Sequence, residues 1–308
     1  MITAGSTSFL EDAMRPRDIA AYTFLAFAWG LSFVLLLHVV AAFGWIGAVT
    51  LRSLIAGGLL FAVARLSRRK LSFNAGWLPL AVVGATTVAG QLIGLSYATP
   101  RIGTAMAAIF VAAIPLFSMI IAQIWGLERI TPTRIAGLML GTIGIVMLVG
   151  FPAVPVDKTF VLGCGAMVFS TFSAAFGSNY ASLHLKGTGA WEVTIGSFIA
   201  GGILTLPLLA FVPVPGVPAP IDYLYLVALA GLMSALTYVL YFDLVKSIGP
   251  TPAISVEFAV TVVAVLVGAL VLDEPLTVLQ LLGGAVIIAG CALVLGLLPF
   301  GRSARKTA

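Results

Sequence analysis

The sequence predicts an all-α integral membrane protein with ten transmembrane helices, arranged as two inverted five-helix repeats. Composition is the first reason: of 308 residues, 61% are hydrophobic and 9% are charged, and the mean hydropathy is +1.15. A soluble domain usually has about 25% charged residues, so this chain is suited to lipid. The other two reasons are ten long apolar runs and an internal repeat. Too few residues remain outside the runs for a soluble catalytic or nucleotide-binding domain.

Each run is long enough to cross a hydrocarbon core about 30 Å thick, which takes roughly 20 helical residues. Membrane β-barrels show short alternating segments instead, whereas these runs are continuous and rich in Leu, Ala and Gly. In chain order the predicted helices cover residues 19–41, 44–66, 77–98, 101–123, 132–150, 160–182, 190–212, 221–246, 250–272 and 277–299.

The N-terminal segment does not resemble a cleaved signal peptide. The first apolar run is longer than a signal h-region, and the tail before it carries Glu11 and Asp12. Cys164 and Cys291 lie in separate runs and support neither a disulfide nor a metal site. We therefore expect no metal and no cofactor.

The positive charges predict the topology. Ten spans place the tails 1–18 and 300–308 and the even-numbered loops on one side, which holds thirteen Lys and Arg residues. The other side holds only Arg101 and Lys158. Because Lys and Arg concentrate in cytoplasmic loops, we expect both termini in the cytoplasm and the protein in a bacterial inner membrane. The net charge of +5 then reflects topology, and no nucleic-acid partner is expected.

An internal repeat divides the chain. Residues 103–150 align without gaps with 249–296 at an offset of 146, and the matches include the polar pair Glu128 and Glu274. The repeats are predicted over 19–150 and 160–299, with five helices each. Five is odd, so the second repeat enters the membrane from the opposite face. Inverted repeats are typical of alternating-access carriers, with the site near the midplane between them.

Several segments resemble the EamA family of the drug/metabolite transporter superfamily. They are Trp-Gly-Leu-Ser-Phe-Val at 29–34, Arg52, Pro115, Gly-Leu-Glu-Arg-Ile-Thr at 126–131 and Leu-Asp-Glu-Pro-Leu-Thr at 272–277. The resemblance covers nearly the whole chain, and within the family it is similar to YddG-type bacterial amino-acid exporters. It implies a ten-helix basket around a central cavity and export of amino acids, including aromatic ones. The second repeat departs from the first at Thr261, which stands where Pro115 predicts a proline.

Polar and aromatic positions inside the spans are the candidate substrate contacts. Lipid penalises polar faces, so they are expected to point inward, although hydroxyl residues also serve in helix packing. Aromatic groups with a few amide and hydroxyl groups suit an amino acid with a large apolar side chain. The predicted cavity residues are Trp29, Ser32, His38, Gln91, Tyr97, Phe176, Asn179, Tyr238, Tyr241 and Glu257.

Charged and proline positions in or near the spans complete the prediction. Glu257 is either a partner for a substrate ammonium or a proton, or a protonated group bonded to a neighbouring helix. Arg52, Glu128 and Glu274 are expected to be structural, with a substrate carboxylate as the less favoured partner of Arg52. Pro115 is expected to form a hinge or a fixed bend.

The sequence therefore predicts a carrier that exports aromatic and other neutral amino acids and related metabolites. Exporters of other small metabolites or drugs remain open alternatives, as do two other classes, a membrane-embedded enzyme and a channel. No enzyme motif is found among those sought, which are G-x-x-x-x-G-K-[ST], H-E-x-x-H and G-x-S-x-G, so we expect no catalysis. The expected partners are a small-molecule substrate and membrane lipid, with the monomer as the simplest assembly.

Overall fold

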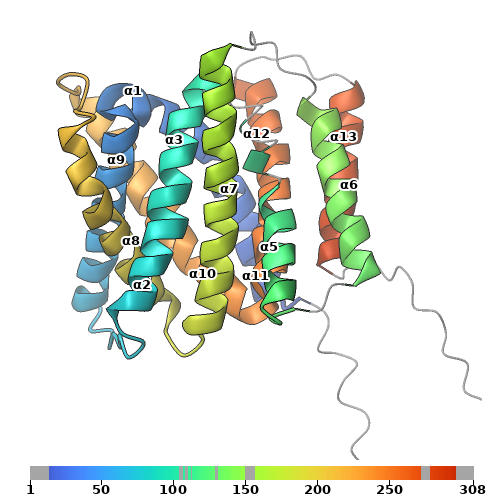
Figure 1. Cartoon of the computed structure of the whole chain (residues 1–308), viewed down its shortest axis with the longest axis horizontal. Helices are drawn as coiled ribbons and strands as arrows, with labels where there is room; N and C mark the ends of the chain where they lie inside the picture. Colours follow the sequence, from blue (N-terminus) through green and yellow to red (C-terminus); the bar gives the residue numbers. More distant parts are fainter. Residues whose placement is uncertain are drawn as a thin grey trace, which may run out of the picture.

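The computed structural model describes residues 14–103, 107, 110–111, 113–128, 131–149, 157–271 and 278–295, and every regular element within these ranges is helical. The helices stand side by side in a bundle (Figure 1). In chain order they are α1 (Pro16–Leu66), α2 (Trp77–Val83), η1 (Gly84–Gly90), α3 (Gln91–Ile102), α5 (Ile114–Ile124), α6 (Pro132–Val149), α7 (Lys158–His184), α8 (Ala190–Thr205), η2 (Leu206–Ala210), α9 (Pro220–Ala230), η3 (Gly231–Leu236), α10 (Thr237–Ile248), α11 (Pro250–Ile254), α12 (Val256–Val271) and α13 (Val278–Val294).

Several of these segments are suited to cross a bilayer. Among the described residues, five are long and apolar enough: Pro16–Leu66, Trp77–Ile102, Lys158–His184, Ala190–Ala210 and Pro220–Ile248. Their outward faces expose large apolar side chains such as Phe27, Phe61 and Phe169, which would be unfavourable in water but favourable against lipid. The predicted all-helical membrane class is confirmed, whereas the number of ten spans stays a prediction.

The long first element consists of two helices. Gly44 has φ 72° and ψ 163°, which is not helical, so α1 breaks there and corresponds to the two predicted runs 19–41 and 44–66. A proline marks another change: α8 ends at Thr205 and continues as the 3-10 helix η2, with Pro207 in its first turn. In both places the break follows a residue that cannot or need not continue an α-helix.

Two predicted runs are interrupted in the structure. The run 101–123 was expected as one helix, but α3 ends at Ile102, Gly103 has φ 82°, and α5 begins at Ile114. The run 250–272 is divided between α11 and α12 at Ser255, six residues before Thr261. Apolar composition predicted these runs, and it does not report such local breaks.

The chain shows the same succession of elements twice. A π-helix, η1 or η3, leads into a 12-residue helix, α3 or α10, and each of these ends at a glycine with positive φ, Gly103 at 82° and Gly249 at 89°. The first residue after each π-helix, Gln91 and Thr237, and the closing glycines are each 146 positions apart, which is the offset of the sequence repeat.

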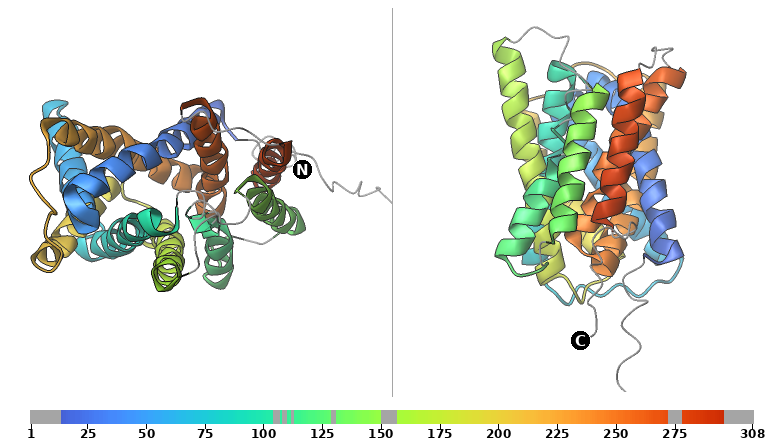
Figure 2. Two further views of the ribbon diagram at one scale, coloured as in Figure 1. Left: turned by 90° about the horizontal axis from the view of Figure 1, so that it is seen from above. Right: turned by 90° about the vertical axis from the view of Figure 1, so that its right-hand side faces the viewer.

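Helices α6 and α13 form a closely packed pair at one side of the bundle (Figures 1 and 2). A Cβ atom added at Gly137 would lie 2.8 Å from the Gly290 carbonyl oxygen, and one at Gly144 would lie 2.8 Å from that of Gly283. As residue numbers rise along α6, those of the contacts on α13 fall, so the two helices are antiparallel. Small residues at this interface let the backbones approach closely, as is common between membrane helices.

We predict that Gly290→Ala destabilises the protein by about 1–3 kcal/mol, because the new methyl group would meet backbone atoms that cannot rotate away. Its Cβ would lie 2.7 Å from the Gly137 carbonyl oxygen and 2.7 Å from the Gly141 nitrogen. Gly58→Ala in α1 is the matched control, since nothing lies within 4 Å of its added Cβ. Thermal unfolding in detergent should give a clearly lower midpoint for Gly290→Ala only, and equal midpoints for the two variants would contradict the close packing.

Candidate functional site

Polar and aromatic side chains from several helices gather in the middle of the bundle. We call this set the polar centre, and its members come from α1, α3, α5, α7, α10, α11 and α12. They are Tyr22, Trp29, Gln91, Ser118, Ser178, Asn179, Tyr238, Tyr241, Thr251, Ser255 and Glu257, and all but Trp29 and Gln91 are buried.

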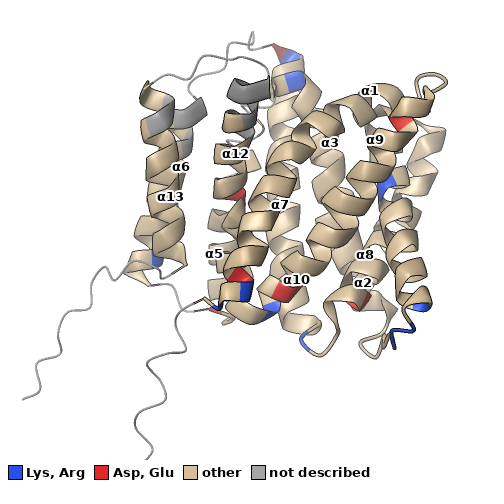
Figure 3. Cartoon of the chain, turned by 180° about the vertical axis from the view of Figure 1, so that it is seen from behind, with Lys and Arg blue, Asp and Glu red and all other residues tan. Residues whose placement is uncertain are grey.

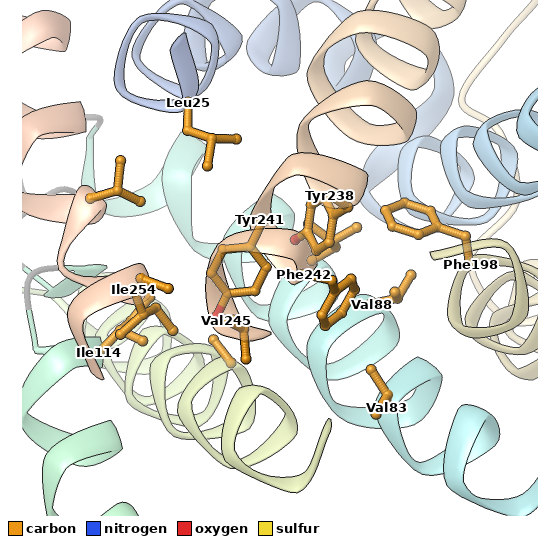
Figure 4. Packing of buried hydrophobic residues seen from close by; sticks show 14 of the residues in the cluster. Leu25, Val83, Val88, Ile114, Phe198, Tyr238, Tyr241, Phe242, Val245 and Ile254 are labelled. Carbon is orange, nitrogen blue, oxygen red and sulfur yellow. The ribbon is translucent and has the colours of Figure 1, made fainter. Parts of the chain in front are cut away.

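Three aromatic rings form the core of the polar centre. The ring of Trp29 on α1 lies 5.6 Å from that of Tyr238 and 5.6 Å from that of Tyr241, both on α10. Phe198 of α8 closes the far side of Tyr238 with an edge contact at 4.9 Å. Figure 4 shows Tyr238, Tyr241 and Phe198 converging from α10 and α8. Tilted and edge contacts of this kind are favourable for aromatic rings.

The tyrosine hydroxyls bind to neighbouring helices. Tyr241 donates to Ser178 Oγ on α7 at 2.6 Å, and the Tyr238 hydroxyl lies 3.5 Å from Gln91 Oε1 on α3. At the edge of the centre, the Tyr22 hydroxyl lies 3.1 Å from Ser255 Oγ. These contacts join α1, α3, α7 and α10 around the aromatic rings.

Asn179 connects α7 to α5. Its Nδ2 atom donates to Ser118 Oγ at 2.9 Å and to the Ala175 carbonyl at 2.8 Å, and Ser118 Oγ lies 3.4 Å from Thr251 Oγ1 on α11. The Asn179 Oδ1 atom is buried and has no hydrogen-bond partner among the described residues. An unsatisfied amide oxygen is costly in an apolar interior, which makes it a candidate acceptor for a ligand.

Two buried residues of opposite charge lie in this region. Arg52 of α1 is 5% exposed and Glu257 of α12 is 7% exposed. Arg52 donates from Nε to Ser234 Oγ at 2.5 Å and from Nη2 to the Met233 carbonyl at 3.3 Å. The expectation that Arg52 satisfies carbonyl groups is consistent with these bonds, although its role stays a prediction.

The structure brings some of the predicted cavity residues together and separates others. Trp29, Gln91, Asn179, Tyr238, Tyr241 and Glu257 lie in the polar centre. Ser32 donates to the Trp29 carbonyl within α1 at 2.7 Å, so its hydroxyl is occupied locally.

Three predicted residues lie away from the centre. His38 is exposed, its Nδ1 lies 2.9 Å from the Val34 carbonyl oxygen, and its ring lies 5.2 Å from that of Tyr225. Tyr97 packs against Trp45 at 5.1 Å and against the Arg101 guanidinium at 3.7 Å. Phe176 packs against Trp125 at 5.3 Å and against Tyr180 at 6.0 Å.

The sequence interpretation missed Tyr22, Ser118, Ser178, Thr251 and Ser255. Helical spacing could have found Tyr22, because it lies seven residues before Trp29 and so on the same face of α1. Ser178 is adjacent to Asn179 and Ser255 lies two residues before Glu257, but no spacing rule distinguishes them from other small hydroxyl residues.

Glu128 joins separate parts of the chain at one end of the bundle. Its Oε1 accepts from the Thr251 backbone nitrogen at 3.1 Å, in the first turn of α11, and its Oε2 accepts from Arg134 of α6 at 3.0 Å. We expected it to favour the helix that follows it; its Thr251 partner instead lies on a helix of the other predicted repeat. Glu274 lies outside the described residues, and Pro115 lies in the first turn of α5.

The end of the bundle that holds Glu128 also has two pockets. One of about 350 Å³ is lined by residues of α7, α8, α10 and α11, including Glu128, Lys186 and Lys246. Another of about 270 Å³ lies between α1 and α10 and includes Arg17, Asp18 and Asp243. Both are lined by charged as well as apolar residues, unlike the aromatic core of the polar centre.

An apolar helical bundle that buries polar and aromatic groups at its centre defines a membrane protein of the transporter class. The model of the EamA-like transporter family matches residues 19–150 and 161–296. The chain therefore belongs to this family, as the sequence motifs predicted.

Relatives over most of the chain carry transporter names. The "Uncharacterized inner membrane transporter YedA" of Escherichia coli (strain K12) is 26% identical over 86% of this chain and 86% of its own. "Protein PecM" of Dickeya dadantii (strain 3937) is 25% identical over 94% of this chain and 95% of its own. An "Uncharacterized transporter" of Archaeoglobus fulgidus is 24% identical over 86% and 94%. A solved crystal structure with 19% identity shares the fold with a TM-score of 0.75, covering 92% of this chain and 98% of that one.

The carboxyl of Glu128 should make stability depend on pH. Burial raises the pKa of Glu128 above its ordinary value of 4.5, although Arg134 and the Thr251 nitrogen partly oppose this. The folded state therefore binds the proton more tightly than the unfolded chain, and stability is lost as pH rises from 4.5 through the folded pKa. Glu128→Gln should remove this loss and give a flatter dependence of the unfolding midpoint on pH.

The matched control is Arg134→Gln, which keeps the carboxyl but removes the cation that lowers its pKa. Its loss of stability with rising pH should be greater than in the wild type. Thermal unfolding in detergent between pH 4 and pH 8 tests this, and parallel curves for all three proteins would contradict it.

Proposed function

We propose that the protein is an alternating-access carrier that exports aromatic and other neutral amino acids and related metabolites. The observation that carries this proposal is the cluster of Trp29, Tyr238 and Tyr241 with buried amide and hydroxyl groups beside it. Apolar walls with a few well-placed polar groups are typical of small-molecule sites, and this combination complements an amino acid with a large apolar side chain. Family membership supports transport, and the aromatic core favours this class of substrate.

We also propose that the two halves are inverted repeats. The antiparallel contact of α6 with α13 supports this, because Gly137 meets Gly290 while its repeat equivalent Gly283 meets Gly144. Each residue thus contacts the equivalent of its partner's counterpart, as at an interface with twofold symmetry. The two successions of π-helix, 12-residue helix and glycine support the same relation.

Contacts at one end of the bundle are candidates for a closed cytoplasmic gate. There Arg17 pairs with Asp243 at 3.3 Å, Ser247 donates to Asp18 at 2.8 Å, and Lys246 donates to the Thr188 carbonyl. Figure 3 shows charged residues gathered near the ends of the helices. The bias of Lys and Arg supports a cytoplasmic location for this end, so these contacts would separate when a substrate enters from the cytoplasm.

Trp29→Ala should reduce saturable phenylalanine flux by roughly tenfold, because the substrate loses an aromatic contact and apolar area worth about 1–3 kcal/mol. Trp77→Ala is the matched control, since Trp77 is 61% exposed and stacks on Phe73 at the end of α2. The measurement is uptake of labelled phenylalanine into proteoliposomes of purified protein. Absence of flux for a broad amino-acid panel with intact wild-type protein would reject the substrate class, and equal effects of both variants would reject the site.

The orientation is tested by single cysteines at the two ends of α8. In a protein without Cys164 and Cys291, Lys186→Cys should react with a membrane-impermeant thiol reagent only from the cytoplasmic side. Val217→Cys, at a position that is 98% exposed, should react only from outside, because a spanning helix places its ends on opposite faces. Labelling of both from one side, or the reverse pattern, would contradict the proposed topology.

A further inference from the structure

Arg52 and Glu257 are the charged residues nearest to the aromatic core, and neither is paired with the other. Within the described residues, the ion pairs are Arg17–Asp243 and Arg134–Glu128. A buried charge without a counter-charge costs several kcal/mol, so two such groups of opposite sign beside one aromatic cluster need an explanation. Packing alone supplies none, since an apolar residue would serve it better.

The known bonds of Arg52 use only part of its capacity. A guanidinium has five N–H donors, and the two bonds to Ser234 and the Met233 carbonyl leave three without an acceptor among the described residues. Both acceptors are neutral and lie in the π-helix η3. Arg52 is thus positioned by η3 but not neutralised by it.

Glu257 has an even less satisfied side chain. Its backbone carbonyl accepts from Thr261 Oγ1 at 3.1 Å, but its carboxyl makes no hydrogen bond or ion pair among the described residues. Helix α12 lies against α1 next to Trp29, because Gly30 faces Val260 and Val263.

Tyr238 connects the two charges. Its hydroxyl lies within electrostatic range of both the Arg52 guanidinium and the Glu257 carboxyl, and its ring contacts Trp29. The cation, the aromatic core and the carboxyl are therefore neighbours contributed by α1, α10 and α12.

The geometry points to a two-point site for a zwitterion in which Arg52 binds the carboxylate, Glu257 binds the ammonium group, and the rings of Trp29, Tyr238 and Tyr241 bind the apolar side chain. This inference rests on the proposed function and specifies how the substrate is recognised. A zwitterion neutralises both buried charges at once, whereas an amine or a carboxylic acid neutralises only one. Charge-assisted hydrogen bonds are about twice as strong as neutral ones, so the site selects α-amino acids over compounds with the same side chain and one charge.

The experiment compares three probes with one phenyl side chain: L-phenylalanine, phenethylamine, which lacks the carboxylate, and 3-phenylpropionate, which lacks the ammonium group. Their dissociation constants are measured by titration calorimetry with the purified full-length protein, and flux of phenylalanine is measured in proteoliposomes. Wild-type protein should bind phenylalanine at least about tenfold more tightly than either analogue.

Arg52→Gln should weaken phenylalanine and 3-phenylpropionate while leaving phenethylamine unchanged, and Arg52→Lys should keep much of the wild-type preference. Glu257→Gln should weaken phenylalanine and phenethylamine while leaving 3-phenylpropionate unchanged. Arg17→Gln is the control, because that arginine is exposed at the end of α1 and should leave all three constants unchanged. Ratios between probes within one variant are compared, since partial unfolding lowers all three signals together.

The outcomes separate the two proposals. No phenylalanine flux with intact wild-type protein overturns the proposed function. Flux in the wild type with equal affinity for phenylalanine and the analogues, or variants that weaken all three probes equally, overturns the zwitterion site while transport stands. The wild-type comparison alone is decisive if Arg52→Gln or Glu257→Gln does not fold.

Discussion

The absence of water from a hydrocarbon core determines how this chain folds. Every backbone and side-chain polar group inside the membrane must find its partner within the protein, which explains why all the described elements are helical. It also explains the opposite fates of neighbouring residues on α7. Phe169 and Phe172 are exposed, whereas Ser178 and Asn179 are completely buried and bonded to other helices.

The same constraint operates where the helices are irregular. In η3 the wider π-helical turn changes which backbone groups pair, and Arg52 donates to the Met233 carbonyl there. At the end of the bundle, Glu128 binds both Arg134 and the first turn of α11. In each case a charged side chain satisfies backbone or side-chain groups contributed by a distant part of the sequence, so these charges are part of the fold as well as candidates for function.

Much of the architecture could be predicted from apolar runs, because each helix must be long enough to cross the membrane. The polar centre was partly predictable, since Tyr238 and Tyr241 lie on one helical face and Trp29 belongs to a family motif. Phe176, Tyr97 and His38 were assigned to the cavity but lie elsewhere, because a helix that is apolar all round does not reveal from its sequence which face meets lipid. The Thr251 partner of Glu128 was also unpredictable, since it depends on contact between the two halves of the chain.

The distribution of strong and weak contacts suits the proposed carrier. Glycine contacts between α6 and α13 join backbones directly, and this pair cannot slide without losing close packing. At the end of the bundle, in contrast, the side chains of Arg17 and Asp243 are 79% and 40% exposed, and such surface ion pairs contribute only about 0–1 kcal/mol. Two conformations exchange readily only when their free energies differ by a few kcal/mol. A rigid helix pair beside a weakly closed end meets that requirement, because opening breaks contacts of low energy while the α6–α13 pair stays intact.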